Sequence, residues 1–476
     1  MRMAGLGAAV LAGAVAIAAA SVAGAAEAAA GAPAVVADTA KAPDTDRQTP
    51  ADRLDTFLET SKHPFPWLSW GTDLRLREVY FNNAVVPSKR AAGHERHFER
   101  YRWRIWSTVT PPDVSDVAFN WRIVYEPRPV HKPEALQDWI MEDILFDRLN
   151  LSVKNAAGLP LTVTAGRQDL TDLGNRWIIF EGTPLDGSRT VYFDAFRGTY
   201  EAEPIDTTFD IIWVDQDARG DQWFDPLRDR DTRIAESDER GLIAYARNRS
   251  LEKTQLDGYF IYKRDDPDFA DGNRSHLYTF GARAKGDLAE HWGYDVEFAL
   301  QYGRKNAADV RAGGFQGEIA YHLRDSHQNQ FRIIYEYLSG DDPGTDEIEA
   351  FDTLWGRYAL WSELLFYTYI PETRAGDYTN LHRLTFGHRC KPSEKVELRT
   401  EYHLLFADEN AATANPAIYS SGGYFRGQLL AWWLYYRFNK HVSGHLVTEF
   451  FFPGNFYENF ANDAACFLRY QLEFTW

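Results

Sequence analysis

Hydrophobic and polar side chains alternate along many segments of this chain, which is the pattern of β-strands with two different faces. In residues 465–476, the even positions from Cys466 to Trp476 are mainly apolar, and the odd positions are mostly polar. The same alternation recurs at 292–302, 396–406 and 430–438. These segments have about ten residues or more, the length that a tilted strand needs to cross a bilayer. The pattern therefore predicts membrane-spanning β-structure.

The connections between these segments alternate between short and long. Counting back from Trp476, short connections lie near 439–441, 390–394, 324–328, 286–290, 250–253, 201–204, 155–158 and 111–114. Long connections lie near 82–96, 127–143, 169–187, 216–240, 265–274, 304–312, 339–378, 407–422 and 453–463. This alternation implies about 18 strands and is typical of bacterial outer-membrane barrels, which have short turns at the periplasmic end. We predict an all-β, transmembrane antiparallel β-barrel with both termini periplasmic. Residues 355–369 could instead form an extra hairpin.

The N-terminus predicts export. Residues 1–25 combine Arg2, an Ala-rich apolar stretch and an Ala23-Gly24-Ala25 cleavage site, as a secretory signal peptide does. Residues 26–65 are rich in Ala, Pro, Asp and Thr and predict a flexible periplasmic leader. The barrel then occupies residues 66–476, in the cell outer membrane.

Composition excludes several other functions. The net charge of −18 argues against nucleic-acid binding. No metalloprotease spacing of histidines and no nucleophile elbow occurs in the sequence, so we do not expect an enzyme. We expect no cofactor; the acidic loop at 341–352 could hold calcium, although a solvated acidic loop is commoner.

Eighteen strands enclose a lumen too wide for the wall's own side chains to fill. Any constriction must therefore come from infolded loops, with 216–240 and 339–378 as the candidates. An arginine on the lipid face destabilises a barrel by about 2–4 kcal/mol at the middle of the bilayer. We therefore assign arginines at the polar positions of the alternating strands to the lumen. The assigned side chains are Arg77, Arg100, Arg102, Arg104, Arg122, Arg148, Arg399 and Arg437. They could form a track for a polyanion or a structural lattice with inward carboxylates, and the two arrangements are compatible.

Several motifs resemble the alginate-export porin family. They are R-Y-R-W-R at 100–104, G-R-Q-D-L at 166–170, F-E-G-T-P-L-D-G-S-R-T-V-Y-F-D-A at 180–195, W-G-R-Y-A-L-W-S-E-L at 355–364 and Y-T-N-L-H-R at 378–383. The resemblance spans roughly residues 70–476. It implies an eighteen-stranded barrel that exports an anionic polysaccharide through an arginine-lined constriction. The matched positions are Arg102, Arg104, Arg167, Arg189 and Arg383. The longer leader and the 180–195 variant suggest a divergent branch of the family.

We therefore expect a channel for export or diffusion of an alginate-like anionic polysaccharide or oligosaccharide along an arginine-lined pore. The alternatives are a general small-solute porin with a structural wall lattice, and a non-channel barrel whose loops bind a partner. Expected partners are outer-membrane lipid, the anionic cargo, the barrel-assembly machinery at the strand ending in Trp476, and periplasmic export components. Cargo identity, transport direction, oligomeric state and the constricting loop are left open.

Overall fold

The computed structural model describes residues 50–134, 139–140, 142–175, 192–220, 226–227, 233–356, 359–373 and 378–476. The predicted signal peptide, the first part of the predicted leader, and Arg189 lie outside these residues.

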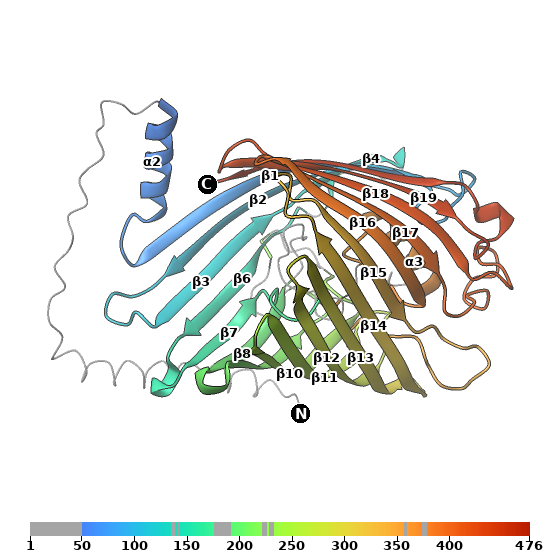
Figure 1. The fold of residues 1–476 in the computed structure, drawn as a ribbon, viewed down its shortest axis with the longest axis horizontal. Coiled ribbons are helices and arrows are strands. Elements are labelled where there is room, and N and C mark those ends of the chain that lie inside the picture. The colour runs from blue at the N-terminus through green and yellow to red at the C-terminus, as the bar shows by residue number, and fades with distance from the viewer. Residues whose placement is uncertain are drawn as a thin grey trace.

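The described chain forms one antiparallel sheet that closes on itself (Figure 1). The wall has 18 strands. They are β1 Leu68–Asn82, β2 Glu95–Val109, β3 Val117–Tyr125, β6 Ile144–Val153, β7 Leu161–Gln168, β8 Phe193–Ala202, β9 Thr207–Gln216, β10 Ser237–Leu251, β11 Thr254–Pro267, β12 Ser275–Ala289, β13 Trp292–Lys305, β14 Ala308–His322, β15 Gln330–Leu338, β16 Leu381–Ser393, β17 Val396–Phe406, β18 Phe425–Arg437, β19 Val442–Pro453 and β20 Ala465–Thr475. Two short strands, β4 Arg128–Lys132 and β5 Trp139–Ile140, extend the wall beyond β3. The predicted all-β, antiparallel barrel of about 18 strands is confirmed.

The C-terminal strand closes the barrel. β20 pairs with β1 from Asp73 opposite Thr475 to Asn82 opposite Cys466. At the chain end, the amide of Trp476 donates to the carbonyl of Thr72 at 2.8 Å, and the reciprocal bond is also 2.8 Å long. A barrel without an open edge leaves no unpaired strand backbone in lipid, which is the condition for crossing a bilayer as β-structure.

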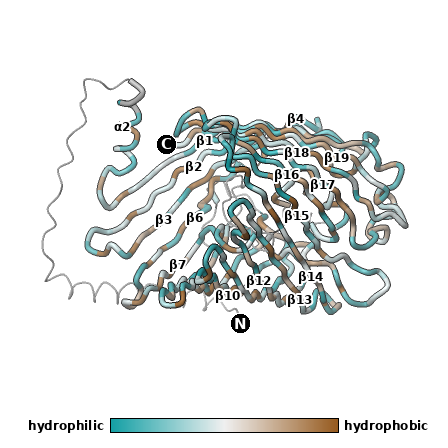
Figure 2. Tube along the Cα trace, viewed as in Figure 1, coloured by the Kyte–Doolittle hydropathy of each residue, from teal (hydrophilic) through white to brown (hydrophobic). Residues whose placement is uncertain are grey.

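Hydrophilic and hydrophobic residues alternate along many strands, as the sequence pattern predicts (Figure 2). On β1, Arg75 is 0% exposed on the lumen side, whereas Leu74 is 39% exposed on the outer side. Large apolar side chains such as Phe280, Phe298 and Leu300 are about half exposed on the outside. A belt of this size would be unfavourable in water, so its solvent is lipid. Among the described residues, none of the helices is long and apolar enough to cross a membrane.

All eight predicted short connections join neighbouring strands of the barrel. One other expectation is wrong. The long connection near 304–312 is a two-residue turn, since Lys305 pairs with Ala308 and Asn306 has a φ of 53°. Asparagine tolerates this left-handed conformation, which such hairpin turns require. The alternative left open for 355–369, an extra hairpin, does not fit either, because α3, Glu363–Thr373, occupies part of that segment as a helix.

The end of the predicted leader is helical and bound to the barrel. Helix α2, Pro50–Lys62, stands beside the C-terminus in Figure 1. Trp70 of β1 donates its indole N–H to the carbonyl of Ser61 at 2.7 Å. His441, in the short β18–β19 turn, lies 2.9 Å from the carboxylate of Asp55. The start of the described chain and Trp476 therefore lie at the same end of the barrel, the end with the short turns.

Candidate functional site

Arginines of β1 and β2 lie side by side on the lumen face because of the register between these strands. Arg75 lies opposite Arg102, Arg77 lies opposite Arg100, and Asp73 lies opposite Arg104. Like charges at directly opposite positions destabilise a sheet unless counter-charges reach them. The predicted arginines of β1 and β2 thus form one cluster rather than separate points along the pore.

Glu126 supplies much of the counter-charge. It lies in the gap between β3 and β4, where the wall strand is interrupted, and it is 0% exposed. Its Oε1 lies 3.0 Å from Nη2 of Arg75, 2.5 Å from Nη2 of Arg100 and 3.8 Å from Nη2 of Arg128. One carboxylate thus stabilises three guanidinium groups.

Asp73 and Glu473 complete the cluster. Arg104 donates from Nε to Asp73 at 2.8 Å, and Arg102 lies 3.6 Å from both Asp73 and Glu473. Arg77 donates to the amide oxygen of Gln471 at 2.6 and 2.8 Å. We call this group the β1–β2 arginine cluster: Arg75, Arg77, Arg100, Arg102, Arg104 and Arg128 with Asp73, Glu126 and Glu473. Its arginines outnumber its carboxylates, so it carries an excess of positive charge.

A second pair of predicted arginines lies on the neighbouring strands. Arg122 of β3 is opposite Arg148 of β6. Arg122 donates from Nε to Asp147 at 2.7 Å and lies 3.4 Å from Asp169, and Arg148 also binds Asp169. The side chain of Arg148 is 37% exposed, more than any arginine of the β1–β2 arginine cluster. Here charges balance, as the structural-lattice alternative expects.

Two arginines at positions matched by the family motifs are buried in bidentate or stacked contacts. Arg167 donates from Nε and Nη2 to Asp194, both at 2.9 Å, and so joins the two strands that flank the β7–β8 loop. Arg383 donates to Glu336 at 2.6 Å and stacks over Trp361 at 4.5 Å. Bidentate and stacked geometry of this kind requires arginine. These contacts hold the loops in place.

The remaining predicted arginines differ from one another. Arg399 donates to Glu401 at 2.8 Å and stacks over Trp433 at 4.4 Å on the lumen wall. Arg437 is the last residue of β18 and is exposed beside the short turn, so it lies away from the clusters. Arg189 lies outside the described residues.

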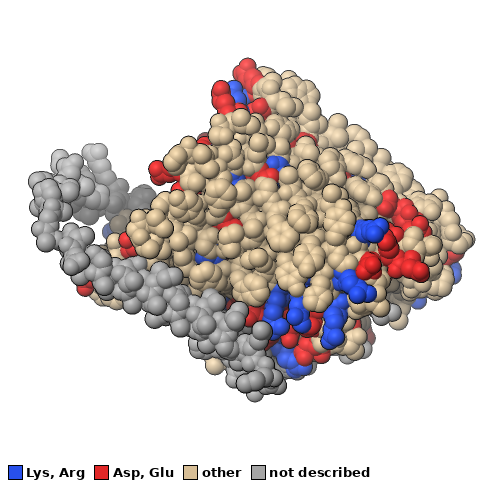
Figure 3. Space-filling view, turned by 90° about the horizontal axis from the view of Figure 1, so that it is seen from below, with Lys and Arg blue, Asp and Glu red and all other residues tan. Residues whose placement is uncertain are grey.

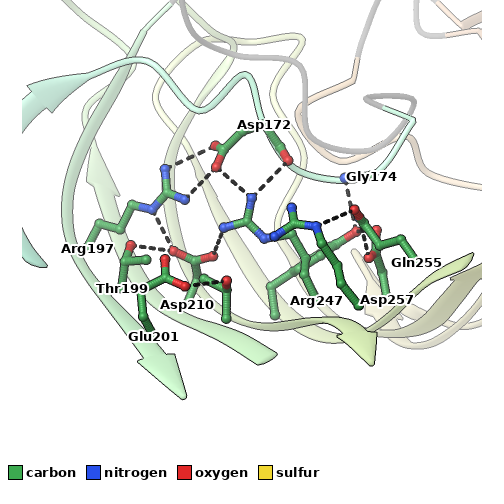
Figure 4. Close-up of polar contacts among 12 residues, drawn as sticks. Asp172, Gly174, Arg197, Thr199, Glu201, Asp210, Arg247, Gln255 and Asp257 are labelled. Carbon is green, nitrogen blue, oxygen red and sulfur yellow. Dashed lines mark hydrogen bonds and ion pairs between the residues drawn. The ribbon is translucent and has the colours of Figure 1, made fainter. Parts of the chain in front are cut away.

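The β7–β8 loop folds into the lumen (Figure 4). Asp172 accepts hydrogen bonds from Arg197 of β8 at 2.8 Å and from Arg247 of β10 at 2.9 Å. Burial opposes ionisation of this carboxyl, but bonding and charge from both arginines more than offset it and lower the pKa of Asp172 below its usual value. These ion pairs hold the start of the loop against β8 and β10 of the wall.

Beyond Asp172 the loop reaches further strands. The amide of Gly174 donates to the hydroxyl of Tyr245 on β10 at 3.0 Å. The amide of Asn175 donates to Glu297 on β13 at 2.8 Å. The loop therefore crosses from β7 to β13 inside the barrel. The sequence analysis did not predict that this loop narrows the lumen. The G-R-Q-D-L motif at the start of the loop was the sequence feature that could have indicated it.

The β15–β16 loop, a candidate constriction from the sequence, also lies inside the barrel. Asp352 binds Lys305 of β13 at 2.9 Å. Burial opposes ionisation of Asp352, but nearby lysine charges lower its pKa to about 2. Trp355 is buried against β10 and lies edge-on to Phe193, with ring centroids 5.7 Å apart. This half of the loop is anchored to one side of the wall.

The other half of the loop is anchored across the lumen. Glu449 of β19 accepts hydrogen bonds from the Ser362 hydroxyl at 2.5 Å and from the amide of Glu363 at 2.9 Å, which places a carboxylate at the start of α3. Glu363 also lies 2.6 Å from Arg469 of β20. The loop thus contacts opposite sides of the barrel. Only parts of the other candidate loop, 216–240, lie among the described residues.

We predict that Gly241→Ala loosens the β15–β16 loop. A Cβ at this position would overlap the ring of Trp355, and overpacking of this kind costs about 1–3 kcal/mol. We expect faster proteinase K cleavage within the loop and larger conductance fluctuations in planar bilayers. Gly258→Ala is the matched control, because a Cβ there meets no atom within 4 Å. Equal protease resistance of both variants would contradict the anchoring role of Trp355.

A cavity of about 540 Å³ opens at the short-turn end of the wall. It lies along β10–β15 and is lined by side chains of both charges, including Arg249, Lys285, Asp295 and Glu318. It is large enough for sugar-sized solutes, because ligand pockets have about 300–1,000 Å³.

The calcium expectation at 341–352 stays a prediction. Among the described residues no group of three or more His, Cys, Asp or Glu side chains is arranged to hold a metal ion. Asp341 and Asp342 instead accept hydrogen bonds from loop amides, those of Glu349 at 3.0 Å and Gly344 at 2.8 Å.

Comparison with known proteins agrees with this architecture. Residues 67–470 match the model of the family described as alginate export. No curated protein sequence matches the chain. Acinetobacter baumannii OccAB2 superposes with a TM-score of 0.53 at 11% identity, over 86% of this chain and 98% of that one. Pseudomonas aeruginosa OpdK with vanillate gives a TM-score of 0.52 at 13% identity, over 86% and 99%. At these identities the likeness shows the fold, and the family match with the porin-type barrel places the chain in the outer membrane.

Proposed function

Because the chain belongs to the alginate export family, we propose that it is a channel for an anionic, carboxylate-bearing polysaccharide or oligosaccharide. The observation that carries the proposal is the positive excess of the β1–β2 arginine cluster. The group around Arg122 and Arg148 holds two guanidinium groups with two carboxylates, whereas this cluster gathers six guanidinium groups on one side of the wall. Unbalanced positive charge on one side of a narrow lumen attracts polyanions.

Cargo would move by exchange of ion-pair partners. Each guanidinium has five N–H donors, and a wall carboxylate uses at most two of them, so a cargo carboxylate can bind before the wall contact is released. Competition from Asp73 and Glu126 then keeps each cargo contact short-lived. A conducting pore needs this balance, because binding must be strong enough for entry and weak enough for exit.

The β15–β16 loop would have to move for a polymer to pass. Arg75, Arg77 and Arg102 are 0–2% exposed, so cargo does not reach them in the described state. The loop lies close to this side of the wall, since Glu363 binds Arg469 and the Tyr367 ring stacks on Phe81 with centroids 4.2 Å apart. Displacement of α3 would uncover the cluster.

A general small-solute porin is the second candidate. The observation that favours it is that many lumen arginines are paired with wall carboxylates, as in Arg167 with Asp194 and Arg383 with Glu336. In that case the arginines would act as structural cross-links, and conductance would be weakly selective.

The proposal includes an orientation of the barrel in the outer membrane. In it the short-turn end, with helix α2 and Trp476, faces the periplasm, where the closing strand would engage the barrel-assembly machinery. Export components of the periplasm would meet the same end. The long loops would face the outside of the cell.

We predict that oligomers of uronic acid block the current through single channels in a concentration-dependent way. Sulfated oligosaccharides of equal length should also block, whereas neutral ones should not, because only anions exchange with the wall carboxylates. Planar-bilayer recording measures this. Large conductance that no oligosaccharide blocks would favour the small-solute porin, and no conductance at all would favour a barrel whose loops bind a partner.

A further inference from the structure

Basic side chains form a continuous row on the outer face of four neighbouring strands. Arg240 of β10 is paired with Arg264 of β11, Arg264 with His276 of β12, and His276 with Arg304 of β13. Neighbouring strands lie about 4.8 Å apart, so the row extends over roughly 15 Å. It lies at the long-loop ends of these strands.

The rows beneath it show the depth at which it lies. Two residues towards the middle of each strand, the paired outer positions are Leu242, Tyr262, Tyr278 and Tyr302. Two further on, they are Ala244, Phe260, Phe280 and Leu300. The order from the middle outward is apolar, tyrosine, then basic. Aromatic girdles mark the membrane–water interface of barrels, so the basic row lies at the depth of lipid headgroups.

Three arginines on this surface share one carboxylate. Asp266 lies 2.8 Å from Arg264 and 3.8 Å from both Arg240 and Arg274. One carboxylate thus serves three arginines, although Asp215 also binds Arg240 at 2.9 Å.

Three arginine side chains on this surface are largely exposed. Arg304 lies 3.2 Å from Asp309 and is 67% exposed, and Arg311 lies 3.3 Å from Glu347 and is 65% exposed. The guanidinium of Arg274 is 68% exposed. Exposed pairs of this kind contribute little stability, so their arginines can accept another anion.

The rest of the outer rim differs. At the long-loop ends of β15, β17 and β19 the outward residues are Tyr337, Phe406 and Phe452. On β1 and β2, Glu78 and Glu99 lie opposite each other on the outer face. The continuous row of three arginines and a histidine lies on β10–β13. Figure 3, which views the barrel from below, shows basic and acidic side chains gathered in groups on a mainly uncharged face.

We propose that this surface is a binding site for the phosphate groups of a membrane lipid headgroup. Its residues are Arg240, Arg264, Arg274, Arg304 and Arg311. A phosphate would relieve the repulsion between Arg240 and Arg264, while acyl chains would cover the Phe260–Phe280 surface directly beneath. The tyrosine row between them suits the glycerol or sugar part of a headgroup, because its hydroxyls can donate hydrogen bonds.

The site does not depend on the cargo. It lies on the outer face, whereas the β1–β2 arginine cluster lies in the lumen on other strands. Its function would be to fix the depth and tilt of one side of the barrel in the membrane. That side carries Glu297 and Lys305, to which the two lumenal loops are anchored.

The test uses the full mature barrel purified in detergent. Its thermal unfolding is followed with bisphosphorylated lipid A, with dephosphorylated lipid A and with inorganic phosphate. We expect lipid A to raise the midpoint by several degrees and the other two to have little effect. The triple variant R264Q/R274Q/R304Q should bind lipid A on the order of a hundredfold more weakly, because it removes three basic residues that lie near the anionic phosphates.

Arg324→Gln is the matched control, because Arg324 is exposed in the short β14–β15 turn at the other end of the barrel. Heat-modifiable gel mobility and channel conductance report whether the variants fold. Equal lipid A binding by the folded triple variant and the control would overturn the proposal. An equal response to dephosphorylated lipid A or to inorganic phosphate would also overturn it.

Discussion

Replacing Arg102 and Arg104 by glutamine is expected to lower the preference of the channel for anions several-fold. Both side chains belong to the β1–β2 arginine cluster, in which arginines outnumber carboxylates. A unit charge about 10–15 Å from a passing anion contributes about 1–2 kcal/mol at an effective dielectric constant near 20. The reversal potential across a salt gradient in planar bilayers measures the change.

The variant Asp73→Asn is the matched control for this experiment. It breaks the same contact with Arg104 but removes a negative charge, so it disturbs the wall equally and changes the local potential in the opposite direction. Selectivity should shift towards anions in Asp73→Asn and towards cations in the arginine variant. Shifts of the same sign in both would mean that wall damage, rather than charge, sets selectivity. Breaking a buried pair costs about 3–5 kcal/mol, so gel mobility should confirm folding of both.

Excision of the β15–β16 loop is expected to raise single-channel conductance several-fold. The loop contacts both sides of the lumen, through Asp352 with Lys305 and through Glu363 with Arg469. Its ends meet, because the amide of Asn380 lies 3.3 Å from the carbonyl of Ser339. Residues 341–378 can therefore be replaced by two glycines without opening the strands. Conductance in planar bilayers measures the gain in open cross-section.

A smaller deletion in the same loop is the control. Residues 342–346 are exposed, away from the lumenal anchors, and their removal should leave conductance unchanged. If full excision also leaves conductance unchanged, the β7–β8 loop, held by Asp172 and Asn175, would be the constriction instead.

The eighteen-strand barrel could be predicted from the sequence because it rests on period-two alternation, which each strand carries locally. The closing strand ending at Trp476, the eight short turns and the lumen-facing positions of Arg77 and Arg102 all follow from that period. The prediction failed at Asn306, where charged residues suggested a long loop. There a single left-handed residue makes the chain turn within two residues.

The candidate site was only half predictable. The alternation of side chains along a strand identifies the face on which an arginine lies. It does not show whether that arginine contacts a carboxylate from a distant strand. Glu126 binds Arg75 and Arg100 only because the wall is interrupted between β3 and β4. The infolding of the β7–β8 loop likewise depends on Asp172 meeting Arg197 and Arg247.

The sequence by itself therefore determined the compartment, the barrel and the faces of its strands, since these depend on residues next to one another along the chain. Only the tertiary structure decided which charges pair, which loops fill the lumen and where basic residues form a row on the outside. Those properties depend on register between strands, and register brings together residues such as Arg77 and Gln471 that lie far apart in the sequence. The closing strand indicates where the protein resides, and the contacts across the lumen decide what passes through it.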